Sequence, residues 1–154
     1  MEKIKELIDV IARLRAPNGC PWDRKQTHET LRPNMLEEAY EAVDAIDEND
    51  MVHLKEELGD VLLQVLLHSQ IASENNAFDI YDVANDLKEK LIYRHPHVFS
   101  DKKIETAEEV KKEWDKLKAK EKTERKSAMD GLSKSQAALI SAQKISKRCR
   151  KNRL

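Results

Sequence analysis

Several features that mark other protein classes are scarce in this 154-residue chain. It holds three glycines, four prolines and 5% aromatic residues, a composition that disfavours a strand-rich fold and favours long amphipathic helices. Its two cysteines, Cys20 and Cys149, lie far apart, and the charged segment from Met1 to Arg15 lacks the apolar stretch of a signal peptide, so we expect a reducing, cytoplasmic setting. No apolar run approaches the roughly 18 residues of a membrane span, so we expect no membrane partner.

Charge is abundant but nearly balanced. Charged residues make up 37% of the chain and hydrophobic residues 40%, and the formal net charge of -1 gives no general reason to expect a nucleic-acid partner. The distribution is uneven, because acidic residues crowd between Glu37 and Glu57 whereas the stretch from Lys144 to Arg153 is basic. We interpret the basic stretch as a solvated tail; a nucleic-acid contact or the start of a further segment are the alternatives.

Apolar residues recur at helical spacing along the chain, and this spacing predicts an all-α fold. The predicted helices run up to about Arg15, from after Asp23 to about Asp47, from after Asp50 through Leu66, from Asp79 to before Pro96, from Thr106 toward Lys126, and from Lys134 to Arg150. Asn34 and Glu37 are spaced like a capping box with Pro33 just before it, which predicts a helix start or a bend near Pro33, and a second capping-box pattern predicts a helix start at Thr106 with Glu109.

Two groups of acidic residues lie on the second and third predicted helices. The second helix carries Glu37, Glu38 and Glu41 in an E-E-x-x-E pattern. The third carries Glu57 and Asp60 in an E-x-x-D pattern, after a connection short enough to make the two helices antiparallel neighbours. Because residues three or four apart share a helix face, each helix can aim two carboxylates at one point. The spacing therefore predicts a cage of four carboxylates, from Glu38, Glu41, Glu57 and Asp60.

Four converging carboxylates need protons or cations beside them. Two like charges about 4 Å apart repel by roughly 4 kcal/mol at an effective dielectric constant of about 20. A divalent metal is the simpler answer, and ligation by oxygen alone suits Mg²⁺, with Mn²⁺ as a substitute. Because Mg²⁺ often shares its coordination with substrate phosphates, the cage also predicts a triphosphate ligand.

The plainer interpretation is that acidic residues at this spacing form ordinary solvated helix faces. Two such pairs on adjacent helices favour the metal site instead. The small side chains of Ala42 and Ala45 would let the third helix come close to the second. Gly59 lies inside the E-x-x-D pattern at a cost of about 1 kcal/mol against alanine, which indicates either a close helix approach or a plain helix irregularity.

These motifs resemble the MazG family of all-α nucleoside triphosphate pyrophosphohydrolases, whose hallmark is E-E-x-x-E followed by E-x-x-D. Residues 20–23, 57–60 and 94–99 also resemble MazG sequences, so the similarity covers nearly the whole chain. The resemblance implies a helical bundle that dimerises, often with helices of both subunits completing each site. It implies hydrolysis of nucleoside triphosphates to monophosphate and pyrophosphate by a domain over residues 1–126, followed by a linker and a basic C-terminal helix over residues 127–154.

The resemblance also implies roles for the acidic residues. By position, the metal ligands are Glu38, Glu41, Glu57 and Asp60. Glu37 is either a further ligand or the group that orients the attacking water, so Glu37 and Glu38 are the candidate catalytic residues. The nucleoside triphosphate would be held by Mg²⁺ and by cations of the chain.

The resemblance also implies that basic and aromatic residues hold the substrate. Lys90 and Arg94, one helical turn apart, match phosphate-contacting positions of the family, and Trp114 with Lys118 matches another such pair. Without the family, Lys90 and Arg94 would be surface cations that favour a helix C-terminus, and Trp114 a core or interface residue. Trp22 either anchors its loop or stacks on a base.

Two departures from the family keep another interpretation open. The chain ends where two-domain relatives continue into a second catalytic domain, so we expect a truncated, excised or naturally single-domain form. His53 stands one turn before Glu57, where some active domains carry lysine. The alternative is a catalytically weak helical module that dimerises and regulates a partner, with a structural metal site. A di-iron bundle would require Glu-x-x-His pairs, and no histidine of this chain has Glu three residues before it.

Overall fold

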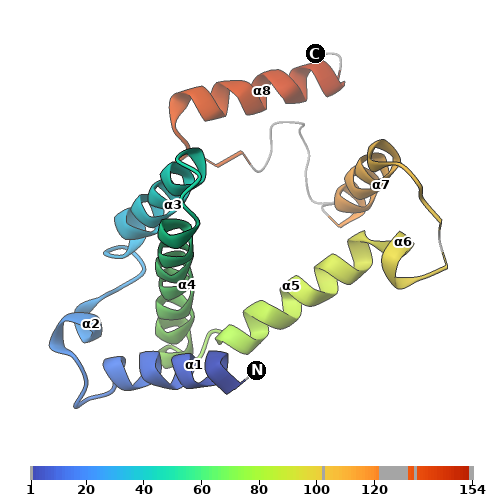
Figure 1. The fold of residues 1–154 in the computed structure, drawn as a ribbon. Coiled ribbons are helices and arrows are strands. Elements are labelled where there is room, and N and C mark those ends of the chain that lie inside the picture. The colour runs from blue at the N-terminus through green and yellow to red at the C-terminus, as the bar shows by residue number, and fades with distance from the viewer. Residues whose placement is uncertain (1, 102, 122–131, 134, 153–154) are drawn as a thin grey trace. The chain divides into compact units, whose positions relative to one another are not determined.

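The structure is a computed structural model that describes residues 2–101, 103–121, 132–133 and 135–152. Within these ranges the chain is built from helices and has no strand, which confirms the predicted all-α class (Figure 1). The helices are α1 (Glu2–Arg15), α2 (Pro21–Lys25), α3 (Arg32–Asp47), α4 (Met51–Glu74), α5 (Ile80–Arg94), α6 (Pro96–Phe99), α7 (Ala107–Lys120) and α8 (Ala138–Asn152). The chain divides into two compact units, Met1–Lys88 and Glu89–Leu154.

The hydrophobic core of the first unit forms between α1, the segment before α3 and the second half of α4. Its buried side chains are Ile11, Leu31, Leu66, Leu67 and Ile71. Six half-buried aliphatic side chains pack around them. Because a single buried leucine or isoleucine contributes about 1.5–3 kcal/mol, this cluster fixes α1 against α4.

Arg15, the last residue of α1, connects three parts of the first unit. Its guanidinium Nε and Nη2 donate to Oε1 and Oε2 of Glu74 at 2.8 and 2.7 Å, and its side chain is only 5% exposed. Nη1 donates to the backbone carbonyl oxygens of Asp23 and Gln26. Glu74 is exposed to solvent, so the ion pair with Arg15 contributes little by itself, and the hydrogen bonds to the two backbone carbonyls hold α2 and the loop after it to the end of α1.

The turn between α3 and α4 takes three residues. Asn49 has a φ of 57°, in the left-handed region. The backbone N–H of Asn49 donates to the carbonyl of Ile46 and that of Asp50 to the carbonyl of Ala45, which are the two bonds of a Schellman motif. The Asp50 carboxylate then accepts from two backbone N–H groups in the first turn of α4. The same short segment therefore ends α3, starts α4 and makes the helices an antiparallel hairpin.

Small side chains lie where the two helices of the hairpin meet. Ala42 is 8% exposed and Ala45 is fully buried, as the sequence predicted. Gly59 behaves differently, because no described atom lies within 4 Å of the position that a Cβ would take there. The interpretation of Gly59 as a point of close helix approach is therefore wrong for the described part of this chain.

The start of α3 agrees with the prediction in place but not in form. Helix α3 begins at Arg32, next to Pro33, which confirms a helix start near Pro33, but it has no side-chain cap, so the capping box at Asn34 with Glu37 is wrong. Helix α2 was not predicted and occupies part of the expected loop at residues 20–23. Pro33 lies in the first turn, where its missing N–H costs no helical hydrogen bond, and this sets the helix start before Asn34.

The second unit contains the end of α5 and helices α6 to α8. Helix α5 ends before Pro96 as predicted, and the hydroxyl of Thr106 accepts from the backbone N–H of Glu109, which confirms that cap. The short helix α6 was not predicted, and α8 begins at Ala138 rather than at Lys134. The predicted extension of α7 toward residue 126 and most of the predicted linker at 127–133 lie outside the described residues, so the domain boundary after residue 126 stays a prediction. In the described ranges no helix has both the length and the apolar character that crossing a bilayer requires.

We expect the left-handed backbone at Asn49 to control the stability of the hairpin. Asn49→Val should lower the free energy of unfolding by about 1–2 kcal/mol, because a β-branched side chain is strained at positive φ, whereas Asn49→Gly should leave it unchanged or raise it slightly. Urea unfolding followed by circular dichroism measures both. Equal losses in the two variants would show that the asparagine side chain matters and the backbone conformation does not.

Candidate metal centre and basic cluster

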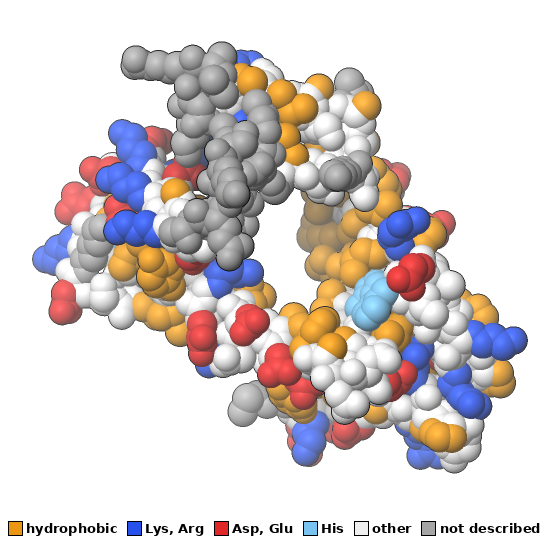
Figure 2. All heavy atoms as spheres, turned by 180° about the vertical axis from the view of Figure 1, so that it is seen from behind, with side chains coloured by type: hydrophobic (Ala, Val, Ile, Leu, Met, Phe, Trp, Pro, Cys, Tyr) orange, Lys and Arg blue, Asp and Glu red, His pale blue; other side chains and the backbone are white. Residues whose placement is uncertain are grey.

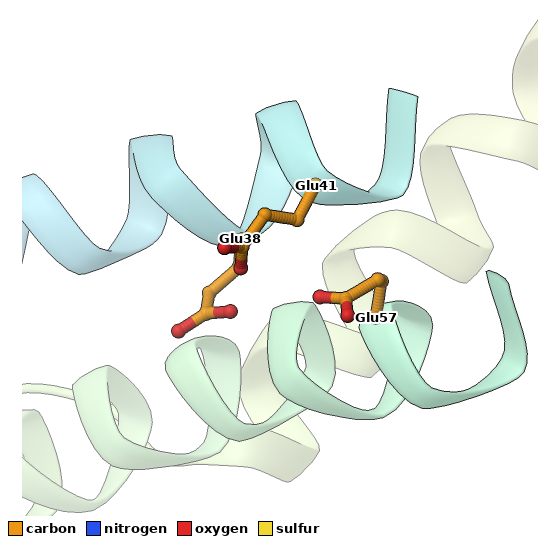
Figure 3. A group of neighbouring side chains, drawn as sticks. All are labelled: Glu38, Glu41 and Glu57. Carbon is orange, nitrogen blue, oxygen red and sulfur yellow. The ribbon is translucent and has the colours of Figure 1, made fainter. Parts of the chain in front are cut away.

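Three of the four predicted metal ligands converge in the first unit. One carboxylate oxygen each from Glu38, Glu41 and Glu57 lie within 4.8 Å of one another. Figure 3 shows Glu38 and Glu41 extending from α3 toward α4, and Glu57 extending from α4 into the same space. We call this group the acidic cluster.

The hairpin turn explains why these residues meet. In an antiparallel helix pair, residues at equal distances from the turn lie at the same level. Glu41 and Glu57 each lie eight residues from Asn49, and Glu38 and Asp60 each lie eleven residues from it. The turn therefore sets which carboxylates face each other.

The electrostatic environment of Glu38 agrees with this arrangement. The pKa of Glu38 is raised above its ordinary value, first because burial disfavours the charged form and then because Asp60, Glu41 and Glu57 carry charges of the same sign. A hydrogen bond with Glu41 also raises it. Asp60 lies outside the group of three converging oxygens, but its charge acts on Glu38 more strongly than that of any other residue.

A histidine contacts the buried member of the acidic cluster. Glu57 is only 7% exposed, and Nε2 of His53 lies 2.9 Å from its Oε1 atom, one helical turn away on α4. The nitrogen can donate its proton to this carboxylate, which satisfies one of the four lone-pair positions. The donor set as a whole is carboxylate oxygen, which suits a hard divalent cation. Burial is the main cause of the raised pKa of Glu38, and the like charges of its neighbours add to it, so the converging oxygens form a site that a cation would stabilise.

Glu37 does not join the acidic cluster. It is exposed on α3, and adjacent helical residues point about 100° apart, so it lies beside the cluster rather than in it. Its role as ligand or water-orienting group stays a prediction.

The polar face of α4 continues beyond the acidic residues. Gln64, one turn after Asp60, is 3% exposed and its Oε1 atom has no hydrogen-bond partner among the described residues.

A pair of histidines lies one turn further along α4. Nδ1 of His68 lies 2.8 Å from Nδ1 of His28, with ring centroids 5.1 Å apart and planes inclined by 4°. These values place the rings end to end in nearly one plane, so one Nδ1–H donates to the other Nδ1. Burial and His28 lower the pKa of His68. Gln64, His28 and His68 were not predicted as site residues. The four-residue spacing of Asp60, Gln64 and His68 does place these three on one face of α4.

The second unit contains a basic cluster, built from α5 and α7. Arg94 is 8% exposed, its guanidinium lies 5.3 Å from the ring centroid of Trp114, and it is paired with the Glu121 carboxylate. Lys90 precedes Arg94 by one turn and Lys118 follows Trp114 by one turn, and both are exposed. We use the name basic cluster for Lys90, Arg94, Trp114 and Lys118.

The interpretation of Arg94 as a surface cation is wrong, because its side chain is buried and paired. Glu121 was not predicted as a site residue, although it lies seven residues after Trp114 and so on the same face of α7. His95 packs edge-on against Trp114, with ring centroids 4.8 Å apart, and its Nδ1 lies 2.6 Å from the carbonyl oxygen of Leu91. These contacts fix the exit of α5.

Trp22 lies in the first unit on α2, and its side chain is 58% exposed. Its backbone carbonyl accepts from the side-chain amide of Gln26 at 3.0 Å. The exposed indole is free to contact a ligand or another surface, and its predicted stacking role stays a prediction.

Comparison with known proteins places these sites in a family. Residues 26–99, which hold the whole acidic cluster, match the MazG nucleotide pyrophosphohydrolase domain. The chain is 53% identical over 127 residues to the nucleoside triphosphate pyrophosphohydrolase/pyrophosphatase MazG of Thermotoga maritima, which covers 82% of this chain and 48% of that protein. It is 45% identical over 152 residues to the nucleoside triphosphate pyrophosphohydrolase of Escherichia coli K12, which covers 97% of this chain and 58% of that protein.

A solved structure shows the same fold. The crystal structure of a mazG-related protein from Thermotoga maritima matches with a TM-score of 0.61 and 32% sequence identity, over 77% of this chain and 98% of that chain. The chain spans about half the length of these two curated relatives.

We expect Glu38→Gln to stabilise the protein without metal. Because the pKa of Glu38 is raised, its ionisation at neutral pH costs stability, and this cost disappears as the pH falls through the raised pKa. The variant should be more stable than the parent protein at neutral pH, with a higher melting temperature, and the gain should shrink in acid. Thermal unfolding with and without Mg²⁺ measures this, and the variant should lose the stabilisation that Mg²⁺ gives the parent protein. The control is Asp47→Asn at the end of α3. A variant less stable than the parent without metal would contradict the repulsion argument.

Proposed function

The chain belongs to the MazG family of nucleotide pyrophosphohydrolases, and from this premise we propose that it hydrolyses nucleoside triphosphates to a nucleoside monophosphate and pyrophosphate. The observation that carries the proposal is the convergence of three carboxylates from two helices in the matched region. The names of its relatives support the same reaction.

We assign the metal to the acidic cluster. Glu38, Glu41 and Glu57, with Asp60 beside them, would hold Mg²⁺, for which Mn²⁺ can substitute. A divalent ion bound there would offset the negative charge of the phosphates and of the transition state. Glu37, exposed next to the cluster, would orient the attacking water or add a ligand oxygen.

The basic cluster is assigned to the substrate. Lys90, Arg94 and Lys118 carry the positive charge that phosphate oxygens require, and guanidinium groups bind such oxygens in a bidentate manner. Trp114 lies beside Arg94 and keeps its guanidinium in place. Trp22, with its exposed indole, would stack on the base.

A homodimer is part of the proposal. Leu36, Tyr40 and Val43 form an exposed apolar stripe on α3, on the side opposite Ala42 and Ala45. Figure 2 shows hydrophobic side chains on the surface of the α3–α4 hairpin. A second copy of this chain would cover such a stripe in a two-fold symmetric interface.

We expect release of pyrophosphate from nucleoside triphosphates to depend on the acidic cluster and on a divalent metal. Glu38→Gln and Glu57→Gln should each reduce kcat by roughly 100-fold or more, because each removes a charged ligand oxygen. A panel of triphosphates, assayed for pyrophosphate with Mg²⁺, with Mn²⁺ and with a chelator, gives the measurement.

The control for this experiment is Asp9→Asn, which removes one exposed carboxylate from α1 and should retain activity. Metal binding without turnover in the parent protein would favour the alternative, a helical regulatory module with a structural metal site. Full turnover in Glu57→Gln would refute the assignment of the metal ligands.

We expect Tyr40→Asp to weaken the dimer by about 30-fold or more in dissociation constant, since loss of a buried interface aromatic typically costs at least about 2 kcal/mol. Sedimentation equilibrium measures the change. Val10→Asp, at an exposed apolar position of α1, is the control and should leave the association unchanged. A monomeric parent protein at micromolar concentration would contradict the assignment of the stripe.

A further inference from the structure

Arg94 is already bound by a carboxylate. Its Nε lies 3.1 Å from each carboxylate oxygen of Glu121, and its Nη2 donates to Oε2 of the same group. The contact engages the Nε–Nη2 edge of the guanidinium, and a phosphate can bind the same edge through two of its oxygens. The guanidinium of Arg94 also lies over the ring of Trp114, 5.3 Å from the ring centroid.

The exposures of the two partners indicate which of them faces solvent. The side chain of Arg94 is 9% exposed and that of Glu121 is 26% exposed. A phosphate that approaches Arg94 from solvent would therefore meet the carboxylate first. A carboxylate and a phosphate each present two oxygens to a guanidinium in a similar geometry, so both cannot occupy the edge together.

The charges around the pair determine which anion can replace Glu121. Lys90 and Lys118 are exposed on the same helix faces as Arg94 and Trp114. A single carboxylate neutralises only part of this positive charge. A polyphosphate carries more negative charge than inorganic phosphate or a monophosphate, so it gains more from the cations of α5 and α7 when it displaces Glu121.

We propose that Glu121 occupies the phosphate position of Arg94 when no ligand is bound, and that it must leave before a polyphosphate can bind there. Because every ligand must displace Glu121, polyphosphates bind at Arg94 in preference to singly phosphorylated ligands, and the monophosphate is released more readily. This inference rests on the proposed function for its biological meaning. The competition between anions at Arg94 can be measured separately.

The test measures pyrophosphate binding by calorimetry without divalent metal, so that the acidic cluster does not contribute. Glu121→Gln should bind pyrophosphate about tenfold more tightly than the parent protein. Glu121→Asp keeps the charge but shortens the side chain by one methylene, and should bind with intermediate affinity. Glu108→Gln makes the same charge change in the first turn of α7 and should have no effect.

A double-mutant comparison shows whether the effect passes through Arg94. In an Arg94→Gln background, replacing Glu121 by Gln should no longer tighten binding. Unchanged affinity in both Glu121 variants would overturn the inference, as would an equal gain with or without Arg94. Thermal unfolding confirms that each variant is folded before binding is compared.

Kinetics separate this inference from the proposed function. If the parent protein hydrolyses triphosphates, Glu121→Gln should lower KM several-fold without raising kcat, and should strengthen product inhibition by the monophosphate. An active parent protein with an unchanged KM in the variant would sink the inference and leave the function intact. An inactive parent protein would sink the function, and the calorimetric comparison would still decide the role of Glu121.

Discussion

The register of the α3–α4 hairpin is the constraint on which the acidic cluster depends. Asn49, with its positive φ, closes α3 and lets Asp50 start α4 within three residues. This places Glu41 level with Glu57 and Glu38 level with Asp60. A turn longer by one residue would rotate one helix face by about 100° and separate the carboxylates. The convergence of the carboxylates is therefore determined by a backbone turn as much as by the acidic residues themselves.

Much of this hairpin could be predicted from the sequence. The E-E-x-x-E and E-x-x-D patterns, the small residues at 42 and 45, and the break at Asn49 and Asp50 all follow from local rules of spacing and capping, and local rules are reliable in a fold built from short-range contacts. The same rules gave the end of α5 before Pro96 and the cap at Thr106. They also gave the start of α3 near Pro33 but not its cap, because a proline in the first turn takes the place of the side-chain cap expected at Asn34.

Other features could not be predicted because they depend on which residues approach across the fold. Helical spacing placed Lys90 and Arg94 on one face of α5, but it could not show that Arg94 is buried against Trp114 and paired with Glu121. It also could not show that Gly59 faces open space, or that His28 meets His68 forty residues away. Sequence periodicity determines the face on which a side chain lies, whereas its partner is determined by tertiary packing.

Each of the two clusters gathers charge of one sign, negative in the acidic cluster and positive in the basic cluster, and each needs an opposite charge or a proton to balance it. In the acidic cluster, burial and then repulsion by the neighbouring carboxylates raise the pKa of Glu38, so that it retains a proton more readily. In the basic cluster, the charge of buried Arg94 is balanced by the carboxylate of Glu121, because a buried guanidinium without a partner would be costly. On the proposed function, a divalent cation would complement the first cluster and a phosphate group the second. Each ligand would replace a proton or a group of the protein that balances the cluster without it. Binding would therefore exchange one set of charge pairs for another.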